Sequence, residues 1–273
     1  MAIEINLQGR TAVVTGASSG IGAAIARRLG AHGALVYLVG RAVAPLREAK
    51  ATIEQAGGKA EIAVLDVRET GALVALIDRA ADDTGSLDVM VNNAGVSYPE
   101  PVLASDETKW REMFEVNVLA LLAGAQAAVR AMRRHGSGGH IVNISSTDAL
   151  VLGNGVYGAT KAAVAYLTHV LRRELEDDAI RVTAVTPGPV ATNVIRNFDP
   201  AILQGLAAAV GLDLVVRPGE GLPSEALGRV QRAMDQQIAN PDDIAEAVLY
   251  IVSQPLRLNI ADIVLRPAKT LTM

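Results

Sequence analysis

TGASSGIG (residues 15–22) is the most informative stretch of the chain, because it follows an apolar, β-branched run, TAVVTG (11–16), and opens a segment of helical pattern at 20–32. Its three glycines allow a tight turn, close approach of the backbone to a phosphate, and close packing of helix on strand. The helix N-terminus offers free N–H groups and the positive end of its dipole to an anion. The stretch therefore predicts a phosphate-binding loop of the dinucleotide type, and a purely structural turn is the alternative.

Apolar runs of strand length alternate with longer helical segments along most of the chain. The runs are rich in β-branched residues and nearly continuous in apolar character, which is typical of parallel strands covered on both faces. Strict alternation predicts a doubly wound, Rossmann-type α/β sheet of about seven parallel strands with helices on both faces. The predicted strands lie at 11–16, 34–40, 61–67, 87–95, 140–146, 180–188 and 261–267, and the predicted helices include 20–32, 45–56, 70–83, 106–134 and 156–176.

We expect one domain over residues 1–273, because no repeat or low-complexity linker interrupts this pattern. The alternation stops only between about 193 and 240, where an apolar piece, AILQGLAAAVGL (201–212), precedes a turn-rich piece and a further helix. A long insertion in a compact domain is usually functional or mobile. We expect a lid that excludes water from a substrate chamber, and a surface excursion without function is the alternative.

The composition excludes several classes of function. The chain has no cysteine, which excludes disulfides and cysteine nucleophiles, and its four histidines have no ligand spacing, so no metal site is expected. A net charge of −4 without any basic run argues against nucleic acid and against an anionic membrane surface. No secretory signal and no apolar stretch of about 18 residues is visible. We therefore expect a cytoplasmic protein with no membrane partner.

The end of the second predicted strand bears on the choice of dinucleotide. An acidic residue there would accept hydrogen bonds from a ribose 2′-hydroxyl, whereas an arginine accommodates a 2′-phosphate. The chain reads LVGRAVAP (38–45), with Gly40 and Arg41 and no acid. The pattern favours NADP(H) over NAD(H), unless Arg41 merely begins a solvated loop. Asp66, at the end of the third strand, can accept a hydrogen bond from an adenine amino group or cap the next helix.

VYGATKAAV (156–164) places Tyr157 and Lys161 four residues apart, so they lie on one face of a predicted helix among small side chains. Together with this run, the motifs of the chain resemble those of the short-chain dehydrogenase/reductase family. They occur in the same order and span nearly the whole chain. The motifs that carry the resemblance are TGASSGIG (15–22), the Asp66 position, NNAG (92–95), Asn117 in EVNVLA, NISS (143–146), YGATK (157–161) and PGPVAT (187–192).

The resemblance implies a Rossmann-type enzyme that transfers hydride between a nicotinamide and a small carbonyl or alcohol substrate. It also implies a homo-oligomer, a tetramer or a dimer, packed through the long helices at 106–134 and 156–176. The family's catalytic tyrosine falls on Tyr157 and its lysine on Lys161. A phenol with a pKa of about 10 is a poor base near neutrality, so a positive charge from Lys161 and from the nicotinamide would be needed to stabilise the phenolate. Tyr157 would then be the general acid and base.

The resemblance assigns the catalytic serine to Ser146, because its place after the fifth strand matches the family. Ser146 lies eleven residues before Tyr157, and the intervening loop is about two residues shorter than the commonest pattern of the family. Ser145 and Thr147 are the alternatives for this role. Asn117 corresponds to a family residue that anchors a water linking the lysine to solvent, and a satisfied polar residue in a helix interface is the alternative reading.

The remaining predicted site residues fall into two groups. Those expected to bind the cofactor are Gly16, Ser18, Ser19, Gly20, Ile21, Gly22, Arg41, Asp66, Val67, Asn93, Ala94, Gly95, Tyr157, Lys161, Pro187, Gly188, Val190 and Thr192. Those expected to line the substrate pocket, because strand ends face the crevice of an open α/β sheet, are Ser97, Tyr98, Asp148, Asn154 and Val190.

Three hypotheses of function remain open at the level of sequence. The first is an NADP(H)-dependent ketoreductase or alcohol dehydrogenase, which the set of Asn117, Ser146, Tyr157 and Lys161 favours. The second is a dinucleotide-binding sensor that has lost turnover, and the third is an assembly subunit stabilised by the cofactor. Fold alone does not separate them, because function depends on the site.

Overall fold

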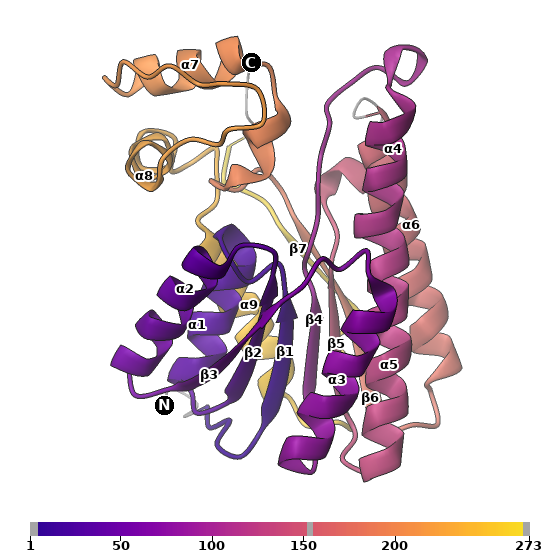
Figure 1. The fold of residues 1–273 in the computed structure, drawn as a ribbon. Helices are drawn as coiled ribbons and strands as arrows, with labels where there is room; N and C mark the ends of the chain where they lie inside the picture. Colours follow the sequence, from indigo (N-terminus) through magenta and orange to yellow (C-terminus); the bar gives the residue numbers. More distant parts are fainter. Residues whose placement is uncertain (1–4, 152–154, 270–273) are drawn as a thin grey trace.

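The computed structural model describes residues 5–151 and 155–269 and is built on one parallel sheet (Figure 1). The sheet has seven strands in the order β3-β2-β1-β4-β5-β6-β7, and every neighbouring pair is parallel. This confirms the doubly wound, Rossmann-type prediction. The strands are β1 (Thr11–Thr15), β2 (Leu35–Gly40), β3 (Lys59–Val64), β4 (Val89–Asn92), β5 (Gly139–Ile144), β6 (Ile180–Pro187) and β7 (Asp262–Leu265).

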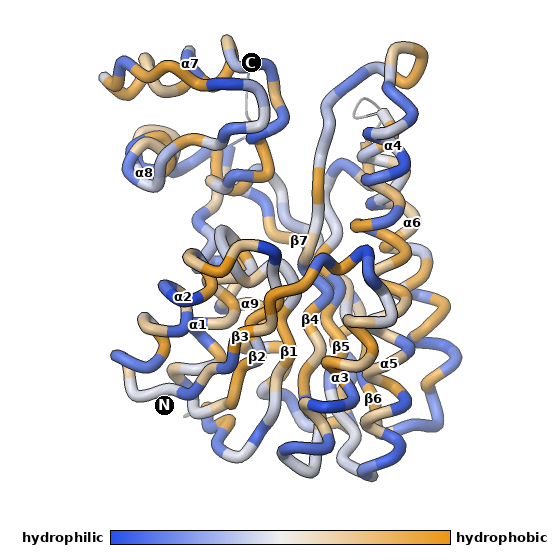
Figure 2. The backbone as a smooth tube through the Cα atoms, viewed as in Figure 1, coloured by the Kyte–Doolittle hydropathy of each residue, from blue (hydrophilic) through white to orange (hydrophobic). Residues whose placement is uncertain are grey.

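Helices cover both faces of the sheet because the inner strands are apolar on both sides (Figure 2). Successive residues of a strand point to opposite faces, so Val14 packs in one core and Val13 in the other. The first face carries α1 (Gly20–Ala31), α2 (Val43–Gln55) and α9 (Pro241–Ser253), and the second carries α3 (Thr70–Thr84), α5 (Ala120–His135) and α6 (Gly155–Glu174).

The long helix on the second face is continuous from Glu107 to His135 but changes geometry in the middle. It begins as α4 (Glu107–Phe114), passes through a π-helical turn, η2 (Glu115–Leu119), and continues as α5. By length and a mean hydropathy of 1.3 it could cross a membrane, a span that the sequence did not lead us to expect. Because 56% of its most apolar window is buried inside the protein, packing on the sheet accounts for its apolar character.

The insertion between 193 and 240, hereafter the lid segment, forms its own small layer above the sheet (Figure 1). It consists of a 3-10 turn, η4 (Asn193–Asn197), and two helices, α7 (Pro200–Ala209) and α8 (Ser224–Ala233). Its buried side chains form a hydrophobic cluster separate from the two cores of the sheet. The members of the lid cluster are Leu203, Ala207, Val216, Leu222 and Ala226.

Backbone contacts join the lid segment to the chain just after β6 and to the C-terminal part of the chain. Val190 and Ala239 form a parallel β-bridge, and the Ala239 N–H donates to the Pro189 carbonyl at 2.9 Å. Near the C-terminal end, the Lys269 N–H donates to the Gln236 carbonyl at 2.7 Å. The two ends of the lid segment therefore lie close together just beyond β6.

The separate cluster predicts that the lid segment unfolds without the sheet. We expect Leu203→Ala to accelerate amide hydrogen exchange across residues 193–240, because it leaves a cavity in a five-residue core. The matched variant Leu38→Ala, in the core of the sheet, should lower the free energy of unfolding by about 2–5 kcal/mol. Leu203→Ala should lower the global value by less than about 1 kcal/mol. Equal global losses in the two variants would contradict a separately folded lid.

Candidate active site

The glycine-rich loop has the shape that a phosphate requires. Gly20 begins α1 with a φ of +54°, and a Cβ added there would lie 3.0 Å from a methyl carbon of Thr192. A Cβ on Gly22 would lie 2.3 Å from the Gly16 carbonyl oxygen. Among the described residues, the N-cap residue Ser19 makes no side-chain hydrogen bond to α1. The first N–H groups of α1 therefore lack a side-chain cap and are suited to hold an anion.

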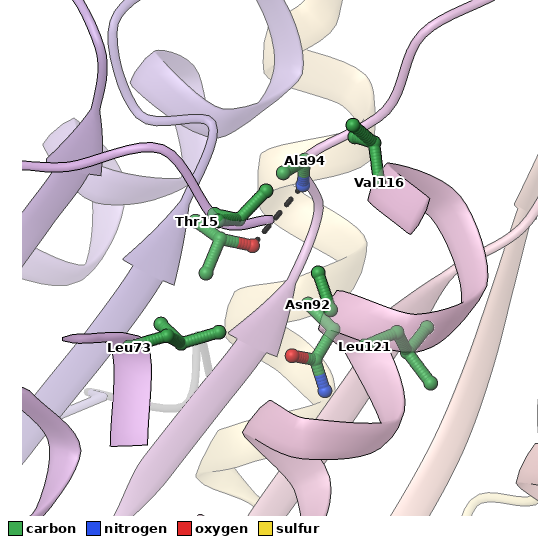
Figure 3. Close-up of a pocket in the computed structure, with 8 residues that line it drawn as sticks. Thr15, Leu73, Asn92, Ala94, Val116 and Leu121 are labelled. Carbon is green, nitrogen blue, oxygen red and sulfur yellow. Dashed lines mark hydrogen bonds between the residues drawn. The ribbon is translucent and has the colours of Figure 1, made fainter. Parts of the chain in front are cut away.

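Hydrogen bonds made by Thr15 and Asn93 join this loop to the loop that follows β4. Thr15 Oγ1 accepts hydrogen bonds from the N–H groups of Asn93 and Ala94, at 2.9 and 3.1 Å, and donates to the Val91 carbonyl at 3.2 Å. Figure 3 shows the bond with Ala94. The Asn93 side chain donates in turn to the Thr15 carbonyl at 2.9 Å. These bonds fix the two loops against each other at the carboxyl edge of the sheet.

Beneath these loops lies a cavity of about 10 Å³, close to the space of one water molecule. Thr15, Val67 and Asn92 are among the residues that line it (Figure 3). Asn92 Nδ2 donates to Asn143 Oδ1 at 2.9 Å, and Asn143 Nδ2 donates to Thr168 Oγ1 at 2.9 Å. These buried amides tie β4 and β5 to α6 below the candidate site.

Helix α6 brings Tyr157 and Lys161 together as the spacing predicts. The Lys161 ammonium lies 5.8 Å from the centroid of the Tyr157 ring. Lys161 is buried, and its Nζ donates to the Ile144 carbonyl at the end of β5 at 3.0 Å. A Cβ on Gly95 would lie 3.6 Å from this Nζ, so the loop after β4 passes directly beside the ammonium.

Asn117 lies in the π-helical turn and faces the same group of residues. Its Oδ1 accepts from the Val96 N–H at 2.9 Å, and its Nδ2 donates to the Val96 carbonyl and to Thr160 Oγ1, both at 3.0 Å. A Cβ on Gly95 would lie 3.5 Å from Asn117 Oδ1. The π turn therefore places Asn117 between the loop after β4 and helix α6, and such turns are frequent at functional sites.

The two serines after β5 have different partners. The Ser145 hydroxyl is buried and donates to the Lys161 carbonyl at 3.1 Å, so it anchors α6 to the strand. The Ser146 hydroxyl donates to Asp148 Oδ2 at 3.0 Å, accepts from the Asp148 N–H at 3.1 Å, and is hydrogen-bonded to Tyr157. Thr147 begins the 3-10 turn η3 (Thr147–Ala149) that Ser146 caps. Ser146 is thus the serine in contact with the phenol.

Burial dominates the protonation of the central pair. Burial raises the pKa of Tyr157, the nearby charge of Asp148 raises it further, and the hydrogen bond with Ser146 opposes this. Burial lowers the pKa of Lys161 to about 8, against the attraction of Asp148. That positive charge from Lys161 and the nicotinamide stabilises the phenolate stays a prediction; in the structure burial is the largest influence on the pKa of Tyr157, and the Lys161 amine donates to the Ile144 carbonyl.

A second group of charged residues lies around Arg41. Arg41 Nη1 is 4.0 Å from Asp66 Oδ2 and 4.0 Å from Glu112 Oε1 on α4. Arg68 binds Asp66 at 2.7 Å, and this hydrogen bond lowers the pKa of Asp66. The Tyr98 hydroxyl donates to Glu112 Oε2 at 2.6 Å. Burial, then the hydrogen bond to Glu112, raise the pKa of Tyr98 to about 12.

The other predicted residues lie along the same edge of the sheet. Ser97 is buried, and its carbonyl accepts from Asn197 Nδ2 of η4 at 3.1 Å. A Cβ on Gly40 would lie 3.4 Å from Ser18. Asn154 lies outside the described residues. The carboxyl end of β6 and its continuation carry Pro187, Gly188, Val190 and Thr192, and the start of α1 carries Ile21.

Sequence reasoning missed the residues that support the site through hydrogen bonds. Thr15 and Thr160 lie inside the motifs TGASSGIG and YGATK, but no role was assigned to them. A polar residue at the end of an apolar strand, as at Thr15 and Asn143, is the signal that could have identified them. Glu112 gave no such signal, because it lies in a helix with several other charged residues and meets Arg41 only in the folded chain.

The sheet order, the glycine loop on α1 and the cluster on α6 define a Rossmann-type oxidoreductase fold. The family model described as short chain dehydrogenase matches residues 10–202, and the chain belongs to the short-chain dehydrogenase/reductase family. The human protein named dehydrogenase/reductase SDR family member 11 is 32% identical over 272 residues, with 96% of each chain covered.

Solved structures with bound dinucleotides are similar along almost the entire chain. An alcohol dehydrogenase from the archaeon Thermococcus sibiricus, complexed with 5-hydroxy-NADP, has a TM-score of 0.76 at 26% identity and covers 97% of this chain and 99% of its own. A short chain dehydrogenase from Mycobacterium paratuberculosis, bound to NAD, has a TM-score of 0.77 at 27% identity, with 96% and 98% covered. The neighbours support a nicotinamide cofactor and include both the NADP and the NAD form.

The low pKa of Lys161 predicts a pH-dependent contribution to stability. Above its folded pKa of about 8 the lysine is neutral in the folded protein but still charged when unfolded, so the cost of burying its charge disappears as the pH rises. The free energy of unfolding of the wild type, relative to Lys161→Met, should increase by about 2 kcal/mol from pH 7 to 9.5. Urea denaturation at a series of pH values measures this, and a constant difference would contradict it.

Proposed function

We propose that the protein is an NADP(H)-dependent ketoreductase or alcohol dehydrogenase that transfers hydride between a nicotinamide and a small carbonyl or secondary alcohol. The observation that carries the proposal is the convergence of Tyr157, Lys161, Ser146 and Asn117 at the carboxyl edge of the sheet, beside the loop at Gly95. A dinucleotide-binding sensor would need the glycine loop but not a hydrogen-bonded tyrosine and serine next to a buried lysine.

In this proposal Tyr157 is the general acid for ketone reduction and the general base for alcohol oxidation. The raised pKa keeps the phenol protonated at neutral pH, which suits donation of a proton to a developing alkoxide. Ser146, which is hydrogen-bonded to the phenol, would orient the substrate oxygen toward it. Lys161 would restore the phenolic proton through a water that Asn117 anchors and that links the lysine to solvent, and its lowered pKa of about 8 favours this exchange near neutrality.

The residues present fit a nicotinamide dinucleotide, which when bound supplies the hydride donor or acceptor. The helix N-terminus at Gly20 and the close contact with Thr192 suit a pyrophosphate, and Gly95 leaves room beside Lys161. Arg41 after β2 favours a 2′-phosphate. Further contacts to the cofactor are proposed for Gly16, Ser18, Ser19, Ile21, Gly22, Asp66, Val67, Asn93, Ala94, Pro187, Gly188 and Val190.

The proposal extends to the lid segment and to assembly. The lid segment would close over the substrate, with Ser97, Tyr98, Asp148 and Val190 lining the pocket. We also propose a homo-oligomer, a dimer or tetramer, in the cytoplasm. Large apolar side chains support this assembly, because Leu119 of the π turn and Tyr166 of α6 remain exposed on the long helices.

The first test is NADPH oxidation against aldehydes, aryl ketones, β-keto acids and cyclic ketones, with the wild type and Tyr157→Phe. Loss of the phenolic proton donor should lower kcat by about 10²–10⁴-fold, whereas the Kd for NADPH should change little. Calorimetric titration of NADPH gives that Kd. Tight NADPH binding by a wild type that turns over none of the substrates would favour the sensor instead.

The partners of the two serines give a second prediction. Ser146→Ala should lower kcat/KM by about 10²-fold or more, because its hydroxyl is bonded to the phenol. Ser145→Ala should keep kcat/KM within about threefold of the wild type and lower the free energy of unfolding by about 1 kcal/mol, because it loses only the bond to the Lys161 carbonyl. Kinetics and thermal denaturation of both variants test this, and the reverse pattern would make Ser145 the catalytic serine.

A further inference from the structure

Glu112 occupies a position that no sequence motif indicates. It lies on α4, and its Oε1 is 4.0 Å from Nη1 of Arg41, which follows β2. The two residues are 71 positions apart, so they meet only because the fold brings α4 beside the residue that follows β2. Arg41 is the residue proposed to accommodate a 2′-phosphate. The Arg41 guanidinium therefore already has a carboxylate neighbour, that of Glu112 on α4.

The position of this carboxylate is fixed. Its Oε2 accepts the hydrogen bond from the Tyr98 hydroxyl at 2.6 Å, and the Glu112 side chain is only 21% exposed. Arg41 is 56% exposed and therefore freer to move. Asp66, the other carboxylate 4.0 Å from Arg41, is engaged by Arg68 at 2.7 Å. Among the described residues, Arg41 is the only basic side chain within 4.0 Å of a Glu112 carboxylate oxygen. Arg68 lies farther from Glu112, although the charge of Glu112 raises the pKa of Arg68.

We propose that Glu112 is a cofactor-specificity residue that limits the preference for NADP(H) over NAD(H). This inference rests on the proposed function. The end of β2 has no acidic residue, and Glu112 supplies a carboxylate from α4 instead. An anion that pairs with Arg41 takes the guanidinium from Glu112 and lies near a fixed negative charge, which lowers its affinity. A ribose with a free 2′-hydroxyl carries no such charge and can donate to a carboxylate instead. The protein therefore binds both dinucleotides.

The test is direct binding of both nucleotides, which does not depend on turnover. Calorimetric titration of NADPH and NADH gives the Kd values for the wild type and for Glu112→Gln, which preserves side-chain size. We expect Glu112→Gln to lower the Kd for NADPH about fivefold, the upper range for one partly exposed charge pair, and to change that for NADH less than twofold. Competition by 2′,5′-ADP should strengthen in parallel, because it carries the same 2′-phosphate.

Two further variants separate the local contact from a general charge effect. Glu107→Gln removes the same charge from α4, but Glu107 is paired with Arg111 at 2.6 Å and has no contact with Arg41, so the ratio of the two Kd values should not change. Tyr98→Phe removes the hydroxyl that donates a hydrogen bond to Glu112, so more of the negative charge of Glu112 is left to repel the 2′-phosphate. NADPH binding should therefore weaken while NADH binding is retained.

The outcomes distinguish this inference from the proposed function. An unchanged ratio of Kd values in Glu112→Gln, or an equal change in Glu107→Gln, would overturn the role of Glu112 and leave the oxidoreductase proposal standing. The expected shift in the ratio without turnover of any substrate would support Glu112 and overturn the ketoreductase. A wild type that binds neither nucleotide would overturn both.

Discussion

The candidate site depends on the hydroxyl of Thr15. Parallel strands bring the ends of β1 and β4 to one edge of the sheet, but the loops that leave these ends need a further constraint to keep a fixed distance. Thr15 Oγ1 supplies it by accepting from two successive N–H groups, those of Asn93 and Ala94, and donating to the Val91 carbonyl. The same hydrogen bonds therefore hold the glycine-rich loop and the loop beside Lys161 together, and a displacement of either loop disturbs the other.

The fold buries Tyr157 and Lys161, the two ionisable residues at the centre of the candidate site. Burying Lys161 disfavours its ammonium form, and burying Tyr157 disfavours its phenolate, so burial favours the neutral form of both residues. One backbone carbonyl, that of Ile144, satisfies the amine. Burying ionisable groups is costly for stability, and groups whose pKa values burial perturbs in this way are concentrated at catalytic sites.

The sequence predicted the parts of the structure that depend on local pattern. Alternating apolar runs gave the parallel sheet, and the spacing of Tyr157 and Lys161 gave their shared helical face. It could not predict contacts that arise only when distant segments meet, such as Glu112 with Arg41. The spacing of Tyr157 and Lys161 likewise shows their proximity but not their degree of burial, which is the largest influence on both pKa values. The π turn at Asn117 likewise has no clear sequence signal, because it inserts into an otherwise regular helical pattern.

The β-bridge between Val190 and Ala239 has a consequence for how this scaffold can diversify. Because Val190 and Ala239 pair through their backbones just beyond β6, the two ends of the 46-residue excursion from 193 to 238 lie close together. The loop-closure entropy of such an excursion grows only slowly with its length. The excursion also carries its own apolar cluster. It therefore has the properties of an exchangeable cassette: it could be lengthened, shortened or replaced by another sequence while the strands and the Tyr157–Lys161 helix keep their positions, so new substrates could be acquired without redesigning the chemistry.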